Sequence, residues 1–159
     1  MRTQDDLYFI AQAVALAFKG VSNNEGGPFG ALVVKDGVII GKGNNKVIST
    51  NDPTAHAEVV AIREACAYLG SFQLTGCTIY TSCEPCPMCL GAIYWARPDR
   101  IVYACSREDA AAIEFDDDFI YREINVPLDK RTIPAHQVGR EKGLEIFQFW
   151  REKTDKIKY

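Results

Sequence analysis

Two strand-like runs joined by a tight-turn dipeptide constrain the fold of this chain more than any other local pattern. The runs occupy FGALVVKDGVIIGKG, residues 29–43, and meet at Asp36-Gly37, a dipeptide that two-residue hairpin turns prefer. Helix-like and strand-like runs then alternate: helices at 56–70 and 87–96, strands at 77–82 and 100–105, and a further helix at 107–114. This alternation predicts an α/β fold with helices on both faces of a sheet whose later strands are parallel.

The two ends of the chain are predicted to be mainly helical. Apolar residues recur at helical spacing before Gly20, where a first helix is expected to stop; they are Leu7, Ile10, Ala11, Val14, Ala17 and Phe18. Toward the other end we expect a short helix at 116–124, an extended segment at 131–138 and an aromatic-rich final helix at 144–159. Without repeats or linkers, residues 1–159 are expected to form a single domain.

Composition narrows the choice of partner and compartment. The 159 residues carry a net charge of −3, which offers no general attraction for a polynucleotide and fits a small neutral or weakly polar substrate better. The apolar stretch near the amino terminus is too short to span a membrane and has the wrong flanks for a signal peptide. Six cysteines in such a chain suggest metal ligands or free thiols, and hence a reducing cytoplasmic location.

Three of the cysteines are concentrated in TSCEPCPMC, residues 81–89, where two C-x-x-C spacings share Cys86. Pro87 suits the first position of a helix, which would place Cys86 at its cap and Cys89 one turn later on the same side. The exposed N–H groups and dipole of that helix end would stabilise thiolates. Cys83 lies at the end of the preceding strand and would need a sharp turn to reach the same ion.

His56 and Glu58, at the start of another predicted helix, complete a candidate metal site. An open zinc site would use His56, Cys86 and Cys89 with water in the fourth place, and Glu58 would hold that water and move its proton. A closed site that also uses Cys83, or a redox C-x-x-C pair without metal, remains an alternative. Glu58 favours the open site, because the other two give this carboxyl no role.

HAE at 56–58 followed by PCPMC at 85–89 matches the H-x-E…P-C-x-x-C signature of zinc-dependent nucleobase deaminases. Further strings extend this likeness over nearly the whole length: GGPFGALVV, DPTAHAEVVAIREAC, EFDDDFIY and the final KIKY. Together they resemble the bacterial guanine deaminases of the cytidine deaminase-like fold. The resemblance implies a three-layer α/β/α architecture around a mixed five-stranded sheet, with one zinc ion in each subunit.

The resemblance also implies a reaction, the hydrolysis of guanine to xanthine and ammonia. Zinc would activate water for attack on C2 of the base, Glu58 would carry its proton to the adjacent ring nitrogen, and Asp117 would assist at the leaving amino group. Taken alone, Asp117 fits a solvated acidic turn equally well. Deamination of guanosine or ammeline is the alternative, with cytosine and transfer-RNA adenosine less favoured. A non-enzymatic zinc or redox module is the alternative from another class.

The likeness assigns four further residues to the substrate pocket. Asn45 resembles the family's base-contacting asparagine, and Phe29 and Trp95 resemble aromatic pocket walls. Without the resemblance, Phe29 and Trp95 would be read as core residues and Asn45 as a turn residue. In the family the C-terminal segment crosses to a second subunit, which implies a homodimer with segment exchange and places Tyr159 in the partner's site. The same comparison makes Cys83 a buried neighbour rather than a ligand.

Overall fold

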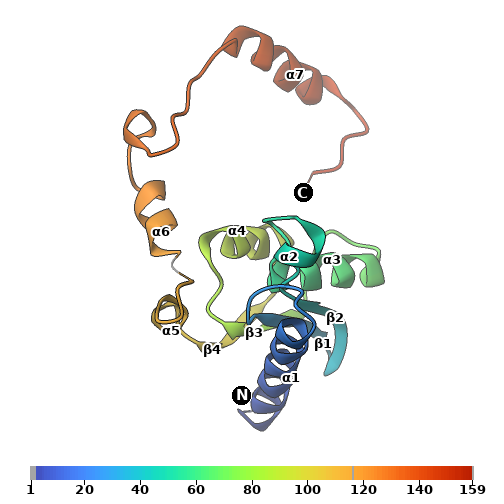
Figure 1. Ribbon diagram of the computed structural model, residues 1–159. Coiled ribbons are helices and arrows are strands. Elements are labelled where there is room, and N and C mark those ends of the chain that lie inside the picture. Colours follow the sequence, from blue (N-terminus) through green and yellow to red (C-terminus); the bar gives the residue numbers. More distant parts are fainter. Residues whose placement is uncertain (1–2, 116, 159) are drawn as a thin grey trace. The chain divides into compact units, whose positions relative to one another are not determined.

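The computed structural model describes residues 3–115 and 117–158, and the chain divides into two compact units (Figure 1). The first unit spans Met1–Asp118 and contains all the strands among the described residues. The second spans Phe119–Tyr159 and is helical or irregular.

A mixed sheet forms the centre of the first unit. Its strands are β1 (Gly30–Lys35), β2 (Val38–Asn44), β3 (Cys77–Cys83) and β4 (Arg100–Cys105), in the order β2-β1-β3-β4. β1 is antiparallel to β2 and β3, whereas β3 and β4 are parallel, as the sequence predicts. Asp36 and Gly37 both have positive φ, of 49° and 78°, which confirms the tight hairpin turn.

The expectation of five strands is wrong in number, since the sheet of the described residues has four. Residues 131–138, expected to be extended, contain no strand and lie in the second unit. The segment includes Pro134, whose missing N–H makes it a poor ladder partner.

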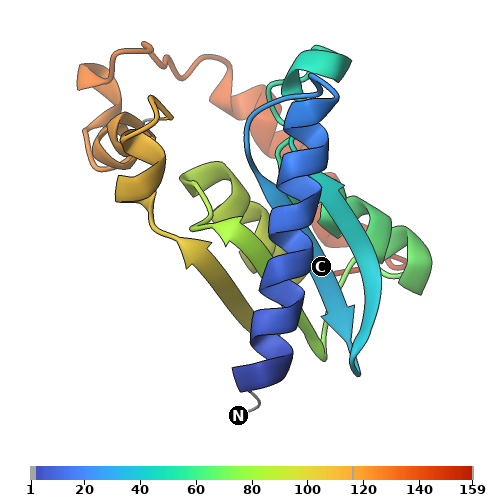
Figure 2. The same cartoon turned by 60° about the horizontal axis from the view of Figure 1, so that its bottom comes forward.

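Helices cover both faces of the sheet and make the first unit a three-layer structure (Figure 2). On one face α1 (Thr3–Ser22) packs Phe9 and Ala13 against Leu32 and Tyr80. On the other face α3 (Ala57–Leu69) and α4 (Pro87–Ala96) enclose a larger core with the strands. Two short helices, α2 (Val47–Thr50) and α5 (Arg107–Ala111), lie in the connections.

The apolar residues that predict α1 do not all lie on its buried side: Ala17 is buried and Ile10 packs against the core, but others are exposed. Phe9, Ala13 and Ala17 are buried, whereas Leu7 and Phe18 are 64% and 70% exposed, and the helix continues two residues beyond Gly20. This orientation follows from the close approach of α1 to β1. A methyl group added at Gly30 of β1 would lie 2.1 Å from the Ala13 carbonyl oxygen, so the strand backbone lies directly against the helix backbone there. Close contact of helix and strand therefore requires the alanine side of α1 to face the sheet.

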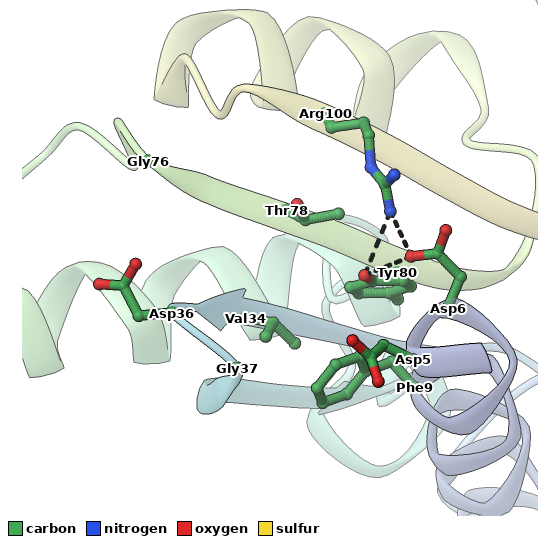
Figure 3. A pocket seen from close by; sticks show the side chains of 10 residues that line it. All are labelled: Asp5, Asp6, Phe9, Val34, Asp36, Gly37, Gly76, Thr78, Tyr80 and Arg100. Atoms are coloured by element: carbon green, nitrogen blue, oxygen red, sulfur yellow. Dashed lines mark hydrogen bonds and ion pairs between the residues drawn. The ribbon is translucent and has the colours of Figure 1, made fainter. Parts of the chain in front are cut away.

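A polar cluster joins the start of α1 to the middle of β3 and the first residue of β4 (Figure 3). The Tyr80 hydroxyl donates to Asp6 at 2.7 Å, and the Arg100 guanidinium donates to both Asp6 and the Tyr80 oxygen. These hydrogen bonds, that from Tyr80 first, lower the pKa of Asp6. The cluster borders a cavity of about 260 Å³ between α1, the hairpin turn and the strand starts.

The second unit contains α6 (Asp118–Ile124) except for its first residue, a 3-10 helix (Leu128–Lys130) and α7 (Arg140–Glu152). The short helix is confirmed, while the final helix begins four residues before Leu144 and ends at Glu152, earlier than predicted. None of these helices contains a buried residue. No helix among the described residues has the length and apolar character needed to cross a membrane.

Gly41 and Gly43 allow the backbone of β2 to lie directly against the backbone of α3. A methyl group added at Gly43 would lie 2.0 Å from the Ala57 carbonyl oxygen, and one added at Gly41 would lie 2.4 Å from that of Ala61. Ala57 opens α3, so this contact fixes the helix end that follows His56.

Gly43→Ala is expected to lower the free energy of unfolding by about 2 kcal/mol, because the added methyl group must push β2 and α3 apart. Gly91→Ala provides a control within α4, where nothing lies within 4 Å of the added carbon. That control should gain up to about 1 kcal/mol from improved helix propensity. Urea unfolding of both variants measures the difference, and equal stability of Gly43→Ala and the parent chain would contradict the packing argument.

Candidate metal centre

The amino ends of two helices carry the predicted metal ligands. His56 is the N-cap of α3 and Cys86 is the N-cap of α4, both in extended conformation and neither using its side chain to cap the helix. Pro87 occupies the first turn of α4 as predicted, and Cys89 follows on the buried side. Because neither side chain forms a capping hydrogen bond with its own helix, the His56 imidazole and the Cys86 thiol are available to bind a metal ion.

The three ligand atoms lie close together. His56 Nδ1 is 3.6 Å from Cys86 Sγ and 3.5 Å from Cys89 Sγ, and all three atoms lie within 4.8 Å of one another. Tetrahedral zinc, with bonds of about 2.1 Å to nitrogen and about 2.3 Å to sulfur, separates such ligands by about 3.6 Å. The group therefore fits zinc without rearrangement, and two sulfurs with an imidazole are the donor set that zinc favours.

Electrostatic interactions within the group prepare it for a cation. Hydrogen bonding from Cys89, supported by His56, lowers the pKa of Cys86 to about 4 against the effect of burial. The Cys86 sulfur in turn raises the pKa of His56, and the negative charges of Glu58 and Asp117 add to that effect. The pKa of Cys89 is raised, mainly by its hydrogen bond to Cys86. The thiolate form of Cys86 is thus favoured, and a positive charge nearby would favour ionisation of Cys89 as well.

Glu58 lies in the first turn of α3 with only 7% of its surface exposed. Burial raises the pKa of this carboxyl, and the negative charge of Cys86 raises it further. Glu58 also hydrogen-bonds with the Cys89 thiol, which places it beside the ligand group. A buried carboxyl with a raised pKa beside a metal group is the arrangement expected of a residue that takes up and releases a proton.

Cys83 lies outside the ligand group that His56, Cys86 and Cys89 form among the described residues. It is buried at the end of β3, where its thiol donates to the Ser106 carbonyl oxygen at 3.4 Å. Burial raises the pKa of Cys83 to about 11, which keeps the thiol protonated at neutral pH. These features fit the buried neighbour that the resemblance implies better than a fourth zinc ligand.

Phe29 and Asn45, both predicted pocket residues, lie together at the same end of the hairpin. The Asn45 backbone N–H donates to the Phe29 carbonyl oxygen at 3.0 Å, and Asn45 is buried, with 4% exposed. The next residue, Lys46, donates its backbone N–H to the carbonyl oxygen of Ala55 at 2.9 Å. Ala55 directly precedes His56, so the Asn45 loop is tied to the metal-ligand segment.

Phe115 is a residue of this region that the sequence interpretation did not select. Its ring meets Phe29 edge-on, with centroids 4.9 Å apart and planes at 90°. The contact joins the start of β1 to EFDDDFIY, the stretch that contains Asp117. Phe115 stands only two residues before Asp117 in the sequence, which could have drawn attention to it. No local sequence pattern, however, identifies Phe29 as its partner.

The structure describes two of the three remaining predicted site residues. Asp117 is partly buried, and its charge contributes to the raised pKa of His56, for which the Cys86 hydrogen bond is the main cause. Trp95 lies near the end of α4 and is 65% exposed. Tyr159 lies outside the described residues.

Comparison with known proteins agrees with this geometry. Residues 3–105 match the family described as the cytidine and deoxycytidylate deaminase zinc-binding region. The guanine deaminase of Bacillus subtilis (strain 168) is 58% identical over 151 residues, which cover 95% of this chain and 97% of that protein. A tRNA-specific adenosine deaminase of Buchnera aphidicola is 35% identical over 96% of this chain and 99% of its own.

A solved structure shows the same fold at high similarity. The X-ray structure of Bacillus subtilis guanine deaminase covers 96% of this chain and 97% of its own, with a TM-score of 0.94 and 57% identity. The matched family region contains His56, Glu58, Cys86 and Cys89, the residues that converge at the two helix ends. This chain therefore belongs to the cytidine and deoxycytidylate deaminase family of zinc-binding proteins.

Proposed function

We propose that this protein is a guanine deaminase, which hydrolyses guanine with one water molecule to xanthine and ammonia. The observation that carries the proposal is the buried Glu58 carboxyl beside the His56, Cys86 and Cys89 group. The identity of 58% to a guanine deaminase, against 35% to a tRNA-specific adenosine deaminase, favours guanine as the substrate. The net charge of −3 also gives no general attraction for transfer RNA.

His56, Cys86 and Cys89 would hold zinc, which when bound supplies a Lewis acid that makes water a stronger acid. Glu58 then takes a proton from the attacking water and delivers it to the ring nitrogen next to C2 of guanine. Its raised pKa suits this exchange, because a carboxyl that titrates closer to neutral pH both accepts and releases a proton readily. The hydroxyl group that water leaves on C2 gives up the second proton, which goes to the amino group. The C2–N bond then breaks, ammonia leaves, and the C2 carbonyl of xanthine forms.

Asp117 would assist at that leaving amino group, and Phe29 and Asn45 would contact the base. Supporting this placement, Phe29 contacts Phe115 near Asp117, and Asn45 is joined through Lys46 to the segment before His56. Trp95 would serve as a second aromatic wall. Because Trp95 is 65% exposed, that role requires a further protein surface to cover it.

A second copy of the chain is the surface we propose. In the second unit every helix lacks buried residues, and large apolar side chains of α7 are exposed, among them Ile146, Phe147 and Phe149. A segment with so much exposed apolar surface gains stability when another protein surface covers it. We infer a homodimer in which residues from 119 onward are exchanged and Tyr159 closes the partner's pocket, so that 1–159 forms one functional domain.

A reducing compartment such as the cytoplasm suits this protein, because all six of its cysteines are free thiols. Two of them are proposed zinc ligands, which must be thiolates rather than a disulfide to bind the ion.

Ammonia release from guanine, guanosine, ammeline, cytosine and adenine tests the substrate assignment. We expect the highest kcat/KM for guanine, because a pocket closed by an aromatic side chain has no room for a ribose. Guanosine should therefore be turned over much more slowly than guanine. Faster release from cytosine or guanosine than from guanine would make the assignment wrong.

Glu58→Gln is expected to lower kcat by at least about 100-fold, because the amide cannot carry a proton. The variant should keep one zinc ion per chain, since His56, Cys86 and Cys89 are unchanged. Metal analysis and ammonia release on the same preparation measure both quantities. Cys83→Ala is the matched control and should keep its zinc and its activity; activity in Glu58→Gln would exclude this carboxyl as the proton carrier.

Two inactive variants test the exchange of the C-terminal segment. When Glu58→Gln and Tyr159→Ala chains are co-expressed, a mixed dimer contains one site with an intact Glu58 and the Tyr159 of the other chain. With random pairing, about one quarter of the parent activity should return. If Tyr159 serves its own subunit, the mixture should be no more active than the separate variants.

A further inference from the structure

The side chain of Asn45 is fixed in orientation at its oxygen end. Its Oδ1 accepts a hydrogen bond from the Val47 backbone N–H at 3.1 Å. Gly26 lies directly against the same oxygen, because a methyl group added at Gly26 would come within 2.1 Å of it. With the oxygen directed toward Val47, the carboxamide presents its N–H₂ end elsewhere, as a donor.

Glu25, the residue before Gly26, is held at three points. Its backbone N–H donates to the Gly20 carbonyl oxygen at 2.9 Å, and its own carbonyl oxygen accepts from the Ser49 backbone N–H at 3.0 Å. Its carboxylate accepts from Asn44 Nδ2 at 2.5 Å. The Asn44 hydrogen bond is also the main cause that lowers the pKa of Glu25, so the carboxylate stays ionised as an acceptor.

Asn44 transmits this anchoring to the next residue. Besides binding Glu25, its Nδ2 donates to the Asn45 backbone carbonyl oxygen at 3.2 Å. The amide also fits tightly against α1, since a methyl group at Gly20 would lie 2.6 Å from Asn44 Nδ2. One side-chain amide thus joins the Glu25 carboxylate, the end of α1 and the backbone of Asn45.

We infer that Glu25, acting through Asn44, is a positioning residue that sets the place of the Asn45 carboxamide for binding of the nucleobase. The inference rests on the proposed function, which makes Asn45 a base-contacting residue. Among the described residues, the hydrogen bonds of Glu25 go to Asn23, Asn44, Gly20 and Ser49 and not to a metal ligand. Its loss should therefore weaken binding of the base and leave proton transfer by Glu58 intact.

Steady-state kinetics of Glu25→Ala test this role. KM for guanine should rise about tenfold while kcat changes by less than about threefold, the pattern of an interaction made equally in the ground and transition states. Zinc content should remain that of the parent chain. Glu25→Gln keeps an oxygen acceptor for Asn44 and should restore KM to within about threefold of the parent value.

Asn23→Ala is the matched control, because Asn23 donates to the other carboxylate oxygen of Glu25 at 3.3 Å from an exposed position. It should leave KM unchanged. Asn44→Ala should raise KM as Glu25→Ala does, and the double variant should be no worse than either single one, because the two residues act as one unit. Multiplied effects in the double variant would overturn the inference.

Two outcomes separate this inference from the proposed function. If the parent chain releases no ammonia from guanine, the proposed function fails whatever the variants do. If the parent chain is active and Glu25→Ala has unchanged KM, or loses zinc and kcat instead, only the positioning role fails. Equilibrium binding of xanthine, the expected product, supplies a readout without turnover, and its Kd should rise about tenfold in Glu25→Ala.

Discussion

The backbone contact between β2 and α3 is the constraint on which the metal group depends. Gly43 allows the strand to lie against the first turn of α3, directly after the N-cap residue His56. Cys86 reaches the same point from the N-cap of α4, a helix that packs into the same core. Core packing thus brings together ligands thirty residues apart in the chain, at the separation that zinc requires.

Local signals account for what the sequence could predict. Asp36-Gly37, Pro87 and the glycine after α3 mark turns and helix ends through backbone preferences that need no tertiary contact. The buried side of α1 was not accessible in this way, because apolar residues follow both sides of that helix and only its fit to Gly30 selects the alanine side. Contacts between distant segments, such as Phe29 with Phe115, carry no local pattern.

Burial of Glu58 by the fold raises the pKa of the carboxyl that is proposed to transfer the proton. A carboxyl placed in the core beside sulfur ligands is hard to ionise, and both burial and the Cys86 charge act in that direction. A cation held by His56, Cys86 and Cys89 would reverse the balance by favouring the ionised forms of all these acids. Metal binding would then stabilise the folded chain as well as prepare the carboxyl for proton transfer.

Both units expose apolar side chains that another protein surface could cover. Unit one exposes aromatic side chains on α4 and β4, including Tyr94, Trp95 and Tyr103, and β4 ends the sheet of the described residues. The helices of unit two bury no residue of their own. Exchange between two copies would cover both surfaces at once. The free energy from burying this apolar surface would then stabilise the dimer and not the single chain. Under the proposed exchange, closure of the pocket would depend on dimerisation, because the closing segment would come from the partner.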